Sequence, residues 1–503
     1  MAERDLRHSD RPSEVPGKRR ARRTDRRPRN RQGRWLRRST AALVVLLLAL
    51  GGVSHQLQLG PRWLGWDYPS PQDEPAEVSP PPGLTLPEQS AAPAVAAAVE
   101  DRSADPTEVR RAVSALLRDP KLGGSVAVAV HQLSDGSSVF RTGPDLVTPA
   151  STMKLLTTVS VLAALGPEHR FGTTVVTGAS PRDIVLVGGG DPLLASGPVD
   201  DDTYPPRADI RTLARATAAR LDDLGRTTVR LGYDTSLFTG PEVSPDWRAS
   251  YVPDDVVSPI SPLWVDEGRT APGASDRVPD PAAAAAETFR VALRKQGITV
   301  KGTPRPVTAP EGAMRLGAVQ SAPLAQIVQW VLEVSDNEGA EVLARHVSLA
   351  EGLPASFDGA SDAMRRVLAD LGIDTTGERL LDGSGLSRRN RLDPETLVAV
   401  LEVAASGEHP ELRSAVAGLP VAGFTGSLAS RFGTGDPAGL GAVRAKTGTL
   451  TGVHGLAGVV TDRDGTELAF VAVADRVKVA NTLDARATLD EVAAALAGCR
   501  CGG

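Results

Sequence analysis

The chain has 503 residues, a length that predicts two or three domains and allows a large hydrophobic core. Its formal net charge is -5 at pH 7, but residues 1–38 contain 15 Lys and Arg against 5 Asp and Glu, so the remainder is strongly acidic. These numbers exclude a basic nucleic-acid-binding body, and two cysteines exclude a fold held together by many disulfides.

The N-terminal part predicts export. Residues 41–53, AALVVLLLALGGV, are an unbroken run of 13 apolar residues directly after the basic head, and SHQLQL extends the segment to residue 59. Positive charge before an apolar segment keeps the head in the cytoplasm and sends the following chain across the membrane. We therefore expect a cytoplasmic head at 1–40, a signal-anchor or signal-peptide segment at 41–59, and an extracytoplasmic body. The body would be membrane-tethered, or secreted if the segment is cleaved.

A spacer and the first folded segment follow. Residues 60–106 are rich in Pro, Ala, Ser and acidic residues, as in PSPQDEP and SPPPG, which predicts a linker without a core. Helical spacing of apolar residues begins at Thr107, in TEVRRAVSALLRD.

Strand patterns lie near both ends of the remaining chain. SVAVAVHQLSDGSSVFRTG contains two apolar runs around Asp135-Gly136, a dipeptide favoured in tight hairpin turns. Residues 442–475 contain three further short strand patterns, and TLDARATLDEVAAALAG predicts a closing helix. We expect one sheet built from both ends of the chain, in a domain formed by residues 107–172 and 314–503.

Residues 173–313 have a different sequence pattern, which predicts one or two inserted domains of mixed α/β type. Short strand patterns alternate there with helical ones and with many prolines. DIVLVGGGDP resembles the glycine turn of a nucleotide fold, but G-x-G-x-x-G is not matched, so a structural turn is the better interpretation. Trp247 and Tyr251 lie in this insert, and we expect packing residues there rather than a substrate pocket.

Metal ligands and cofactor motifs do not emerge from the sequence. The seven histidines have no paired ligand spacing, and Cys499 and Cys501 at the extreme C-terminus predict a surface pair, oxidised outside the cell. We expect no metal and no cofactor.

The stretch TPASTMKLL carries the first chemical signal. Only 7 of the 56 basic residues are lysine, yet Lys154 lies three positions after Ser151, at the predicted start of a buried helix. Residues i and i+3 share a helix face, so the amine lies beside the hydroxyl. A lysine with a lowered pKa can deprotonate a serine, whereas arginine cannot.

Two further short patterns occur once each and in a fixed order. SDN, residues 335–337, taken alone would be a helix N-cap, and KTGT, residues 446–449, taken alone would be a strand end. The order S-x-x-K, S-x-N, K-T-G is the signature of penicillin-binding proteins and serine β-lactamases.

Within that superfamily the chain resembles the low-molecular-mass class C penicillin-binding proteins, the D-alanyl-D-alanine carboxypeptidase/endopeptidase family, of actinobacterial type. The resemblance covers residues 107–503 and includes LVGGGDPLL, DGSGLS at residues 382–387, and the long interval between Ser151 and Ser335. It implies a penicillin-binding, β-lactamase-like transpeptidase fold of the α/β (α+β) class. That fold has a five-stranded antiparallel sheet with helices on both faces, an all-helical part and an inserted mixed α/β domain.

The resemblance also implies a role for each motif residue. Ser151 would attack the carbonyl of the penultimate D-alanine with Lys154 as base, while Ser335 and Lys446 would pass a proton to the leaving amine. The N-H groups of Ser151 and Thr449 would form the oxyanion hole. The implied substrate-binding residues are Asn337 for the substrate amide, Thr447 and Thr449 for the terminal carboxylate, and Gly448 between them. Two amines around one serine would lower each other's pKa, and we expect Lys154 to be the neutral one.

The implied partners are peptidoglycan stem peptides ending in D-Ala-D-Ala, β-lactams as covalent inhibitors, and the membrane through the N-terminal segment, with no nucleic acid. A serine DD-carboxypeptidase is the leading hypothesis, with DD-endopeptidase activity in addition left open. A serine β-lactamase is an alternative, although no E-x-x-L-N supplies its deacylating glutamate. An inactive wall-binding or scaffold protein of the same fold is a second alternative.

Overall fold

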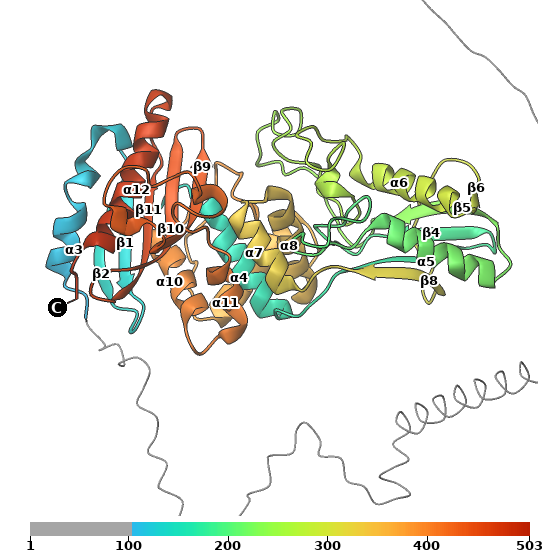
Figure 1. The fold of residues 1–503 in the computed structure, drawn as a ribbon, viewed down its shortest axis with the longest axis horizontal. Helices are drawn as coiled ribbons and strands as arrows, with labels where there is room; N and C mark the ends of the chain where they lie inside the picture. Colours follow the sequence, from blue (N-terminus) through green and yellow to red (C-terminus); the bar gives the residue numbers. More distant parts are fainter. Residues whose placement is uncertain (1–102, 503) are drawn as a thin grey trace, which may run out of the picture. The chain divides into compact units, whose positions relative to one another are not determined.

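The computed structural model describes residues 103–502 (Figure 1). The predicted basic head and apolar segment, residues 1–59, lie outside this range, as does most of the predicted linker. Among the described residues, no helix has the length and apolar character that crossing a bilayer requires.

The five predicted strands form one antiparallel sheet, which confirms the expected assembly from both ends of the chain. The strand order is β2-β1-β11-β10-β9. The strands are β1 (Val126–Gln132), β2 (Ser138–Thr142), β9 (Val443–Leu450), β10 (Val453–Thr461) and β11 (Glu467–Ala474). The early strand β1 pairs directly with the late strand β11, so the C-terminal meander is fixed next to the N-terminal hairpin.

Helices cover both faces of this sheet, as predicted. Along β11, Leu468 and Phe470 belong to the core under α12 (Thr482–Gly498) and α3 (Pro106–Val113). The intervening Ala469 and Val471 belong to the core on the other side, under α10 (Pro394–Ala405). Side chains of a strand alternate between faces, so a strand that is apolar at every position lies between two helical layers.

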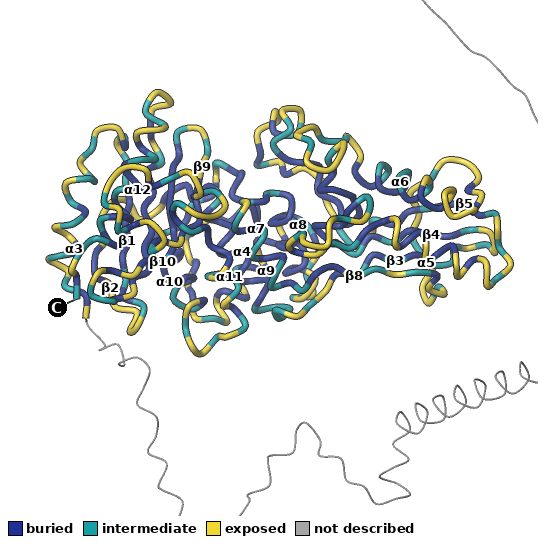
Figure 2. Tube along the Cα trace, viewed as in Figure 1, coloured by how far each residue is buried: buried dark blue, intermediate teal, exposed yellow. Residues whose placement is uncertain are grey.

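An all-helical part continues the second of these cores (Figure 2). Its helices are α4 (Lys154–Leu165), α7 (Leu324–Glu333), α8 (Asn337–Ala350), α9 (Phe357–Asp370) and α11 (Arg413–Ala417). The first nine residues of α4 are all buried, because this helix is surrounded by α7, α8, α9 and α10. A helix that is apolar on all sides is stable only in such a central position.

The inserted segment contains a second, mixed sheet. Its path is β6-β5-β4-β3-β8, with β7 beside β5. The strands are β3 (Gly172–Thr177), β4 (Asp183–Val187), β5 (Thr228–Asp234), β6 (Thr299–Val300), β7 (Arg305–Pro306) and β8 (Arg315–Gln320), and helices α5 (Ile210–Asp223) and α6 (Pro281–Lys295) complete its core. Because β3 and β8 pair with each other, the chain enters and leaves this sheet on adjacent strands.

The two ends of the described chain meet. Ala104, inside the predicted linker, pairs with Gly502, and the Asp105 amide donates to the carbonyl of Cys501. Cys499 and Cys501 form the expected disulfide. The expectation of a surface pair is wrong for Cys501, however, which is fully buried in the core under α12 because the chain end folds back over that core.

One glycine of β10 sets how closely β9 can approach. A Cβ on Gly458 would lie 2.0 Å from the Arg444 carbonyl oxygen and 2.5 Å from the Ala445 Cα. We expect Gly458→Ala to lower the free energy of unfolding by about 1–3 kcal/mol through overpacking, measured as a fall in Tm. The control is Gly407→Ala, where an added Cβ meets nothing within 4 Å. Equal Tm values for the two variants would contradict the packing described for β9 and β10.

Candidate active site

Ser151 lies where a short 3-10 helix, η3 (Ala150–Met153), continues into α4. The preceding Ala150 has a φ of 48°, a left-handed conformation that costs a non-glycine residue of the order of 1–2 kcal/mol. Such strain is typical of sites where the backbone must aim a side chain. Ser151 is half-buried, whereas Lys154, at the first position of α4, is completely buried.

The Lys154 amine is held by three acceptors. Its Nζ lies 3.2 Å from Ser151 Oγ, as the i and i+3 spacing predicted, and donates to Asn337 Oδ1 at 2.8 Å. The third acceptor is the Ser384 carbonyl oxygen at 2.7 Å. Because an ammonium has three hydrogens, these contacts satisfy every donor of the buried group.

The SDN segment lies at the junction of α7 and α8. Ser335 has a φ of 61°, Asp336 is the N-cap of α8, and Asn337 is the first residue of that helix. The Asp336 Oδ1 atom accepts from the Gly339 amide at 2.9 Å, so the helix-cap interpretation holds for Asp336. It does not exclude the chemical one, because the side chains on either side contact the two buried lysines.

The KTGT segment lies on β9, at the edge of the five-stranded sheet. Lys446 is completely buried, and its Nζ lies 2.8 Å from Ser335 Oγ and 3.0 Å from the Thr447 carbonyl oxygen. A Cβ on Gly448 would lie 2.7 Å from the Pro149 carbonyl oxygen. Gly448 therefore allows β9 to lie against the turn that carries Ser151.

The two threonines of this segment differ. Thr447 Oγ1 lies 2.9 Å from Ser427 Oγ, whereas Thr449 is exposed at the end of β9. The structure thus brings Ser151, Lys154, Ser335, Asn337 and Lys446 together through direct contacts, and it places Thr447, Gly448 and Thr449 on the adjoining strand.

The amines of Lys154 and Lys446 have different electrostatic surroundings. Burial lowers the pKa of Lys154 to about 8, while Asp336, Glu341 and Asp382 act in the opposite direction. Burial lowers the pKa of Lys446 well below its usual value, and the nearby Lys154 lowers it further. Among the described residues, Lys446 has two acceptors, against three for Lys154. Burial lowers the pKa of both amines, and the expectation that Lys154 is the neutral one stays a prediction.

Sequence reasoning missed the groups that support Lys154. Glu341 is fully buried one turn after Asn337, and its carboxylate accepts from the amides of Gly383 and Ser384 at 2.8 to 3.2 Å. Burial raises the pKa of Glu341 to about 7, and Asp382 acts in the same direction. Glu341 thus holds the loop whose Ser384 carbonyl binds Lys154. The i and i+4 spacing from Asn337 is the sequence signal that could have indicated it.

Asp382 has a similar supporting position. It accepts from the amides of Gly385 and Ser387 and from Asn390 Nδ2, and its Oδ2 also accepts from Trp247 Nε1 at 2.8 Å. Trp247 and Tyr251 are 7% and 9% exposed and belong to one apolar cluster. The expectation that they are packing residues agrees with this burial.

Comparisons with known proteins agree with the geometry. The model of the D-Ala-D-Ala carboxypeptidase 3 (S13) family matches residues 109–277 and 270–496. Carboxypeptidase DacB of Mycolicibacterium smegmatis is 37% identical over 408 residues, which cover 79% of this chain and 86% of that protein. The D-alanyl-D-alanine carboxypeptidase of Actinomadura sp. is 31% identical over 442 residues, covering 73% of this chain and 81% of that one.

A solved structure shows the same fold. Penicillin-binding protein 4 of Haemophilus influenzae superposes with a TM-score of 0.63 at 24% identity, covering 75% of this chain and 98% of that chain. The order of the three motifs, their convergence on Ser151 and the match over most of the described residues lead to one conclusion: the chain belongs to the D-Ala-D-Ala carboxypeptidase 3 (S13) family.

Proposed function

We propose that this serine D-Ala-D-Ala carboxypeptidase removes the terminal D-alanine of peptidoglycan stem peptides through an acyl-enzyme on Ser151. The observation that carries the proposal is the contact of Lys154 with both Ser151 and Asn337, two motifs far apart in the chain. One amine can then deprotonate the nucleophile while the neighbouring amide side chain binds the peptide.

The acylation step follows from these positions. In the fraction of molecules in which Lys154 is neutral, Ser151 Oγ bonds to the carbonyl carbon of the penultimate D-alanine and its proton moves to Lys154 Nζ. Backbone amides of Ser151 and Thr449 would stabilise the resulting oxyanion. The carbon-nitrogen bond then breaks, and a proton passes through Ser335 and Lys446 to the amine of the departing D-alanine. Water later attacks the ester and releases the shortened peptide.

The surroundings of Lys446 favour proton transfer through Ser335 to the leaving amine. A neutral Lys446 can accept a proton, and the terminal carboxylate of a substrate bound at Thr447 and Thr449 would favour its charged form. Binding of the substrate itself would therefore change Lys446 from a neutral neighbour of Ser335 into an electrostatic partner of the carboxylate.

The two alternative functions, a β-lactamase and an inactive scaffold protein, would require different features of the site. A β-lactamase needs a group that activates the deacylating water, and the chain has no E-x-x-L-N segment. A scaffold protein would tolerate the loss of catalytic contacts, whereas here both lysines are fully buried and contact the hydroxyls that the chemistry requires. A buried amine costs free energy, so a protein without this chemistry would gain by replacing it.

We further propose that the protein acts outside the cytoplasm, tethered by residues 41–59. The basic head before the apolar run supports this orientation, and the substrate supports it too, since peptidoglycan lies outside the membrane. β-Lactams are expected as covalent inhibitors, because penicillin-binding protein 4 of Haemophilus influenzae is described in complex with a β-lactam.

Benzylpenicillin tests the nucleophile and the family mechanism together. Intact-protein mass spectrometry should show one long-lived adduct per chain, and Ser151→Ala should prevent it and lower D-alanine release by at least about 10³-fold. The matched control is Ser160→Ala, a buried serine on the same helix, which should be acylated normally. Rapid turnover of the drug would instead identify a β-lactamase, and D-alanine release by Ser151→Ala at the normal rate would overturn the mechanism.

The acylation rate should depend on pH through Lys154. Because the neutral amine is the base and its pKa is about 8, the second-order rate constant with benzylpenicillin should rise with pH and level off above that value. Glu341→Gln keeps a hydrogen-bond acceptor but removes a charge that raises the pKa of Lys154, so its midpoint should move to lower pH.

Two variants calibrate that experiment. Glu341→Ala removes both the charge and the acceptor for the Gly383 and Ser384 amides, and it should lower the plateau rate as well. Glu351→Gln, at the C-terminal end of α8, should leave the profile unchanged. A Glu341→Gln profile identical to that of the unmodified protein would show that Glu341 does not act on Lys154.

Cell fractionation tests the proposed tether. The full-length protein should sediment with membranes, and Leu47→Arg should reduce that fraction because a charge in the centre of a spanning helix costs about 3 kcal/mol. Leu86→Arg, in the predicted linker, is the control and should have no effect. A secreted product whose mass corresponds to a chain that begins after residue 59 would show that the segment is a cleaved signal peptide.

A further inference from the structure

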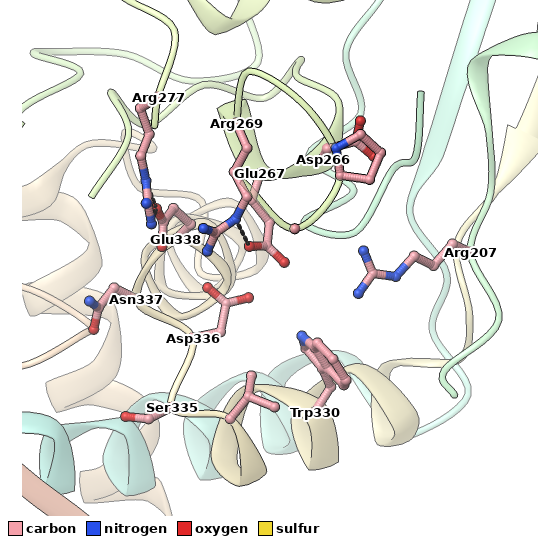
Figure 3. Close-up of a pocket in the computed structure, with 13 residues that line it drawn as sticks. Arg207, Asp266, Glu267, Arg269, Arg277, Trp330, Ser335, Asp336, Asn337 and Glu338 are labelled. Atoms are coloured by element: carbon pink, nitrogen blue, oxygen red, sulfur yellow. Dashed lines mark hydrogen bonds and ion pairs between the residues drawn. The ribbon is translucent and has the colours of Figure 1, made fainter. Parts of the chain in front are cut away.

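The loop of residues 335–337 has a second face, opposite its contacts with the two lysines. A cavity of about 500 Å³ lies behind it, and Ser335, Asp336 and Asn337 form part of its wall. The rest of the wall comes from Trp330 on α7, from Arg207, and from the inserted segment around η4 (Asp266–Gly268). Figure 3 shows Asp336 turned into this space, whereas Ser335 and Asn337 point away from it.

Asp336 presents an unpaired acceptor to the cavity. The side chain is only 7% exposed, its Oδ1 atom is used by the Gly339 amide, and its Oδ2 atom is buried without a hydrogen-bond partner among the described residues. Burial, followed by Glu267 and Glu338, raises the pKa of Asp336 well above its usual value. A cationic donor at Oδ2 would offset the cost of this buried carboxylate.

Unpaired donors line the same cavity. The guanidinium of Arg207 lies over the Trp330 ring at 5.2 Å, and neither Arg207 Nε nor Trp330 Nε1 has a hydrogen-bond partner in the described part of the chain. Figure 3 shows the guanidinium directed into the space above the indole, apart from Glu267, Asp336 and Glu338. These N-H groups form a donor surface for an anion such as a carboxylate.

Four other charged residues around the cavity are already paired with one another. Arg269 Nε lies 3.0 Å from Glu267 Oε2, and Arg277 Nη2 lies 2.8 Å from Glu338 Oε1. Asp266, which also lines the cavity, accepts from the Ser196 amide. The buried groups without a partner in the described part of the chain are therefore Asp336 Oδ2 on one side and the N-H groups of Arg207 and Trp330 on the other. A complementary ligand carries one ammonium and one carboxylate.

We propose that this cavity binds a small zwitterionic amino acid, with its ammonium on Asp336 Oδ2 and its carboxylate on Arg207 and Trp330 Nε1. The amino acid that the proposed function supplies is D-alanine, the leaving group of the reaction, so this choice of ligand rests on that function. Occupancy would fix Asp336, the residue between Ser335 and Asn337, and would thereby act on the contacts of both with the catalytic lysines.

The site is tested separately from the catalytic centre by blocking Ser151 first. The full chain in detergent is treated with benzylpenicillin, acylation is verified by mass spectrometry, and D-alanine binding is measured by titration calorimetry. We expect saturable binding at millimolar concentrations in the acylated protein. N-Acetyl-D-alanine, without the ammonium, and D-alaninamide, without the carboxylate, should bind at least about tenfold more weakly, since each loses a charged hydrogen bond.

Variants identify the contacts. Arg207→Ala should weaken D-alanine binding by roughly tenfold, and Trp330→Phe, which keeps the ring and removes the N-H, by a smaller factor, both with unchanged acylation by benzylpenicillin. Arg220→Ala, an exposed arginine on α5, is the matched control and should bind D-alanine normally. Absence of binding in a fully acylated protein would overturn the site alone, whereas absence of acylation would count against the proposed function. Equal binding by Arg207→Ala would also overturn the site.

Discussion

The burial of the Lys154 amine is the constraint on which the rest of the site depends. An ammonium removed from water must have an acceptor for each hydrogen, or its burial costs several kcal/mol. The three acceptors come from Ser151, from Asn337 and from the Ser384 carbonyl, which lie up to 230 residues from Lys154 in the chain. The helical part must therefore bring α4, the start of α8 and the 382–387 loop to one point, and Glu341 holds the loop in place from within α8.

The five-stranded sheet supplies the second amine by a different means. Lys446 reaches the centre because β9 is an edge strand and because Gly448 lets it lie against the turn at Pro149. Its amine donates to Ser335 and to the Thr447 carbonyl oxygen, with no third acceptor among residues 103–502, and the charge of Lys154 lowers its pKa. The two lysines thus acquire unequal proton affinities from their surroundings rather than from their chemistry. Burial lowers the pKa of Lys154 to about 8, and burial together with the charge of Lys154 lowers the pKa of Lys446 well below its usual value.

Short-range patterns in the sequence predicted much of this arrangement. The hairpin around Asp135-Gly136, the late meander and the closing helix are local signals, and their pairing into one sheet follows from the alternation of buried faces. The single occurrence of each motif made their convergence predictable. Two features depend on long-range contacts and were not predictable in this way: the role of Glu341 and the burial of Cys501 beneath the returning chain end. Each is set by neighbours that no local spacing specifies.

The inserted segment also contributes contacts to the residues that support Lys154. Its strands β3 and β8 pair where it joins the rest of the chain, and its residues around η4 line one cavity together with the start of α8. Arg277 pairs with Glu338, and Trp247 donates to Asp382. Insert residues therefore contact both the start of α8 and the 382–387 loop, the two segments that supply acceptors to Lys154. Asp336 links the insert to the residues around Lys154. It caps α8, lies between Ser335 and Asn337 in the chain, and faces the cavity formed with the insert. A change in the charge that faces Asp336 in the cavity would therefore act on the loop of residues 335–337 without any contact with Ser151.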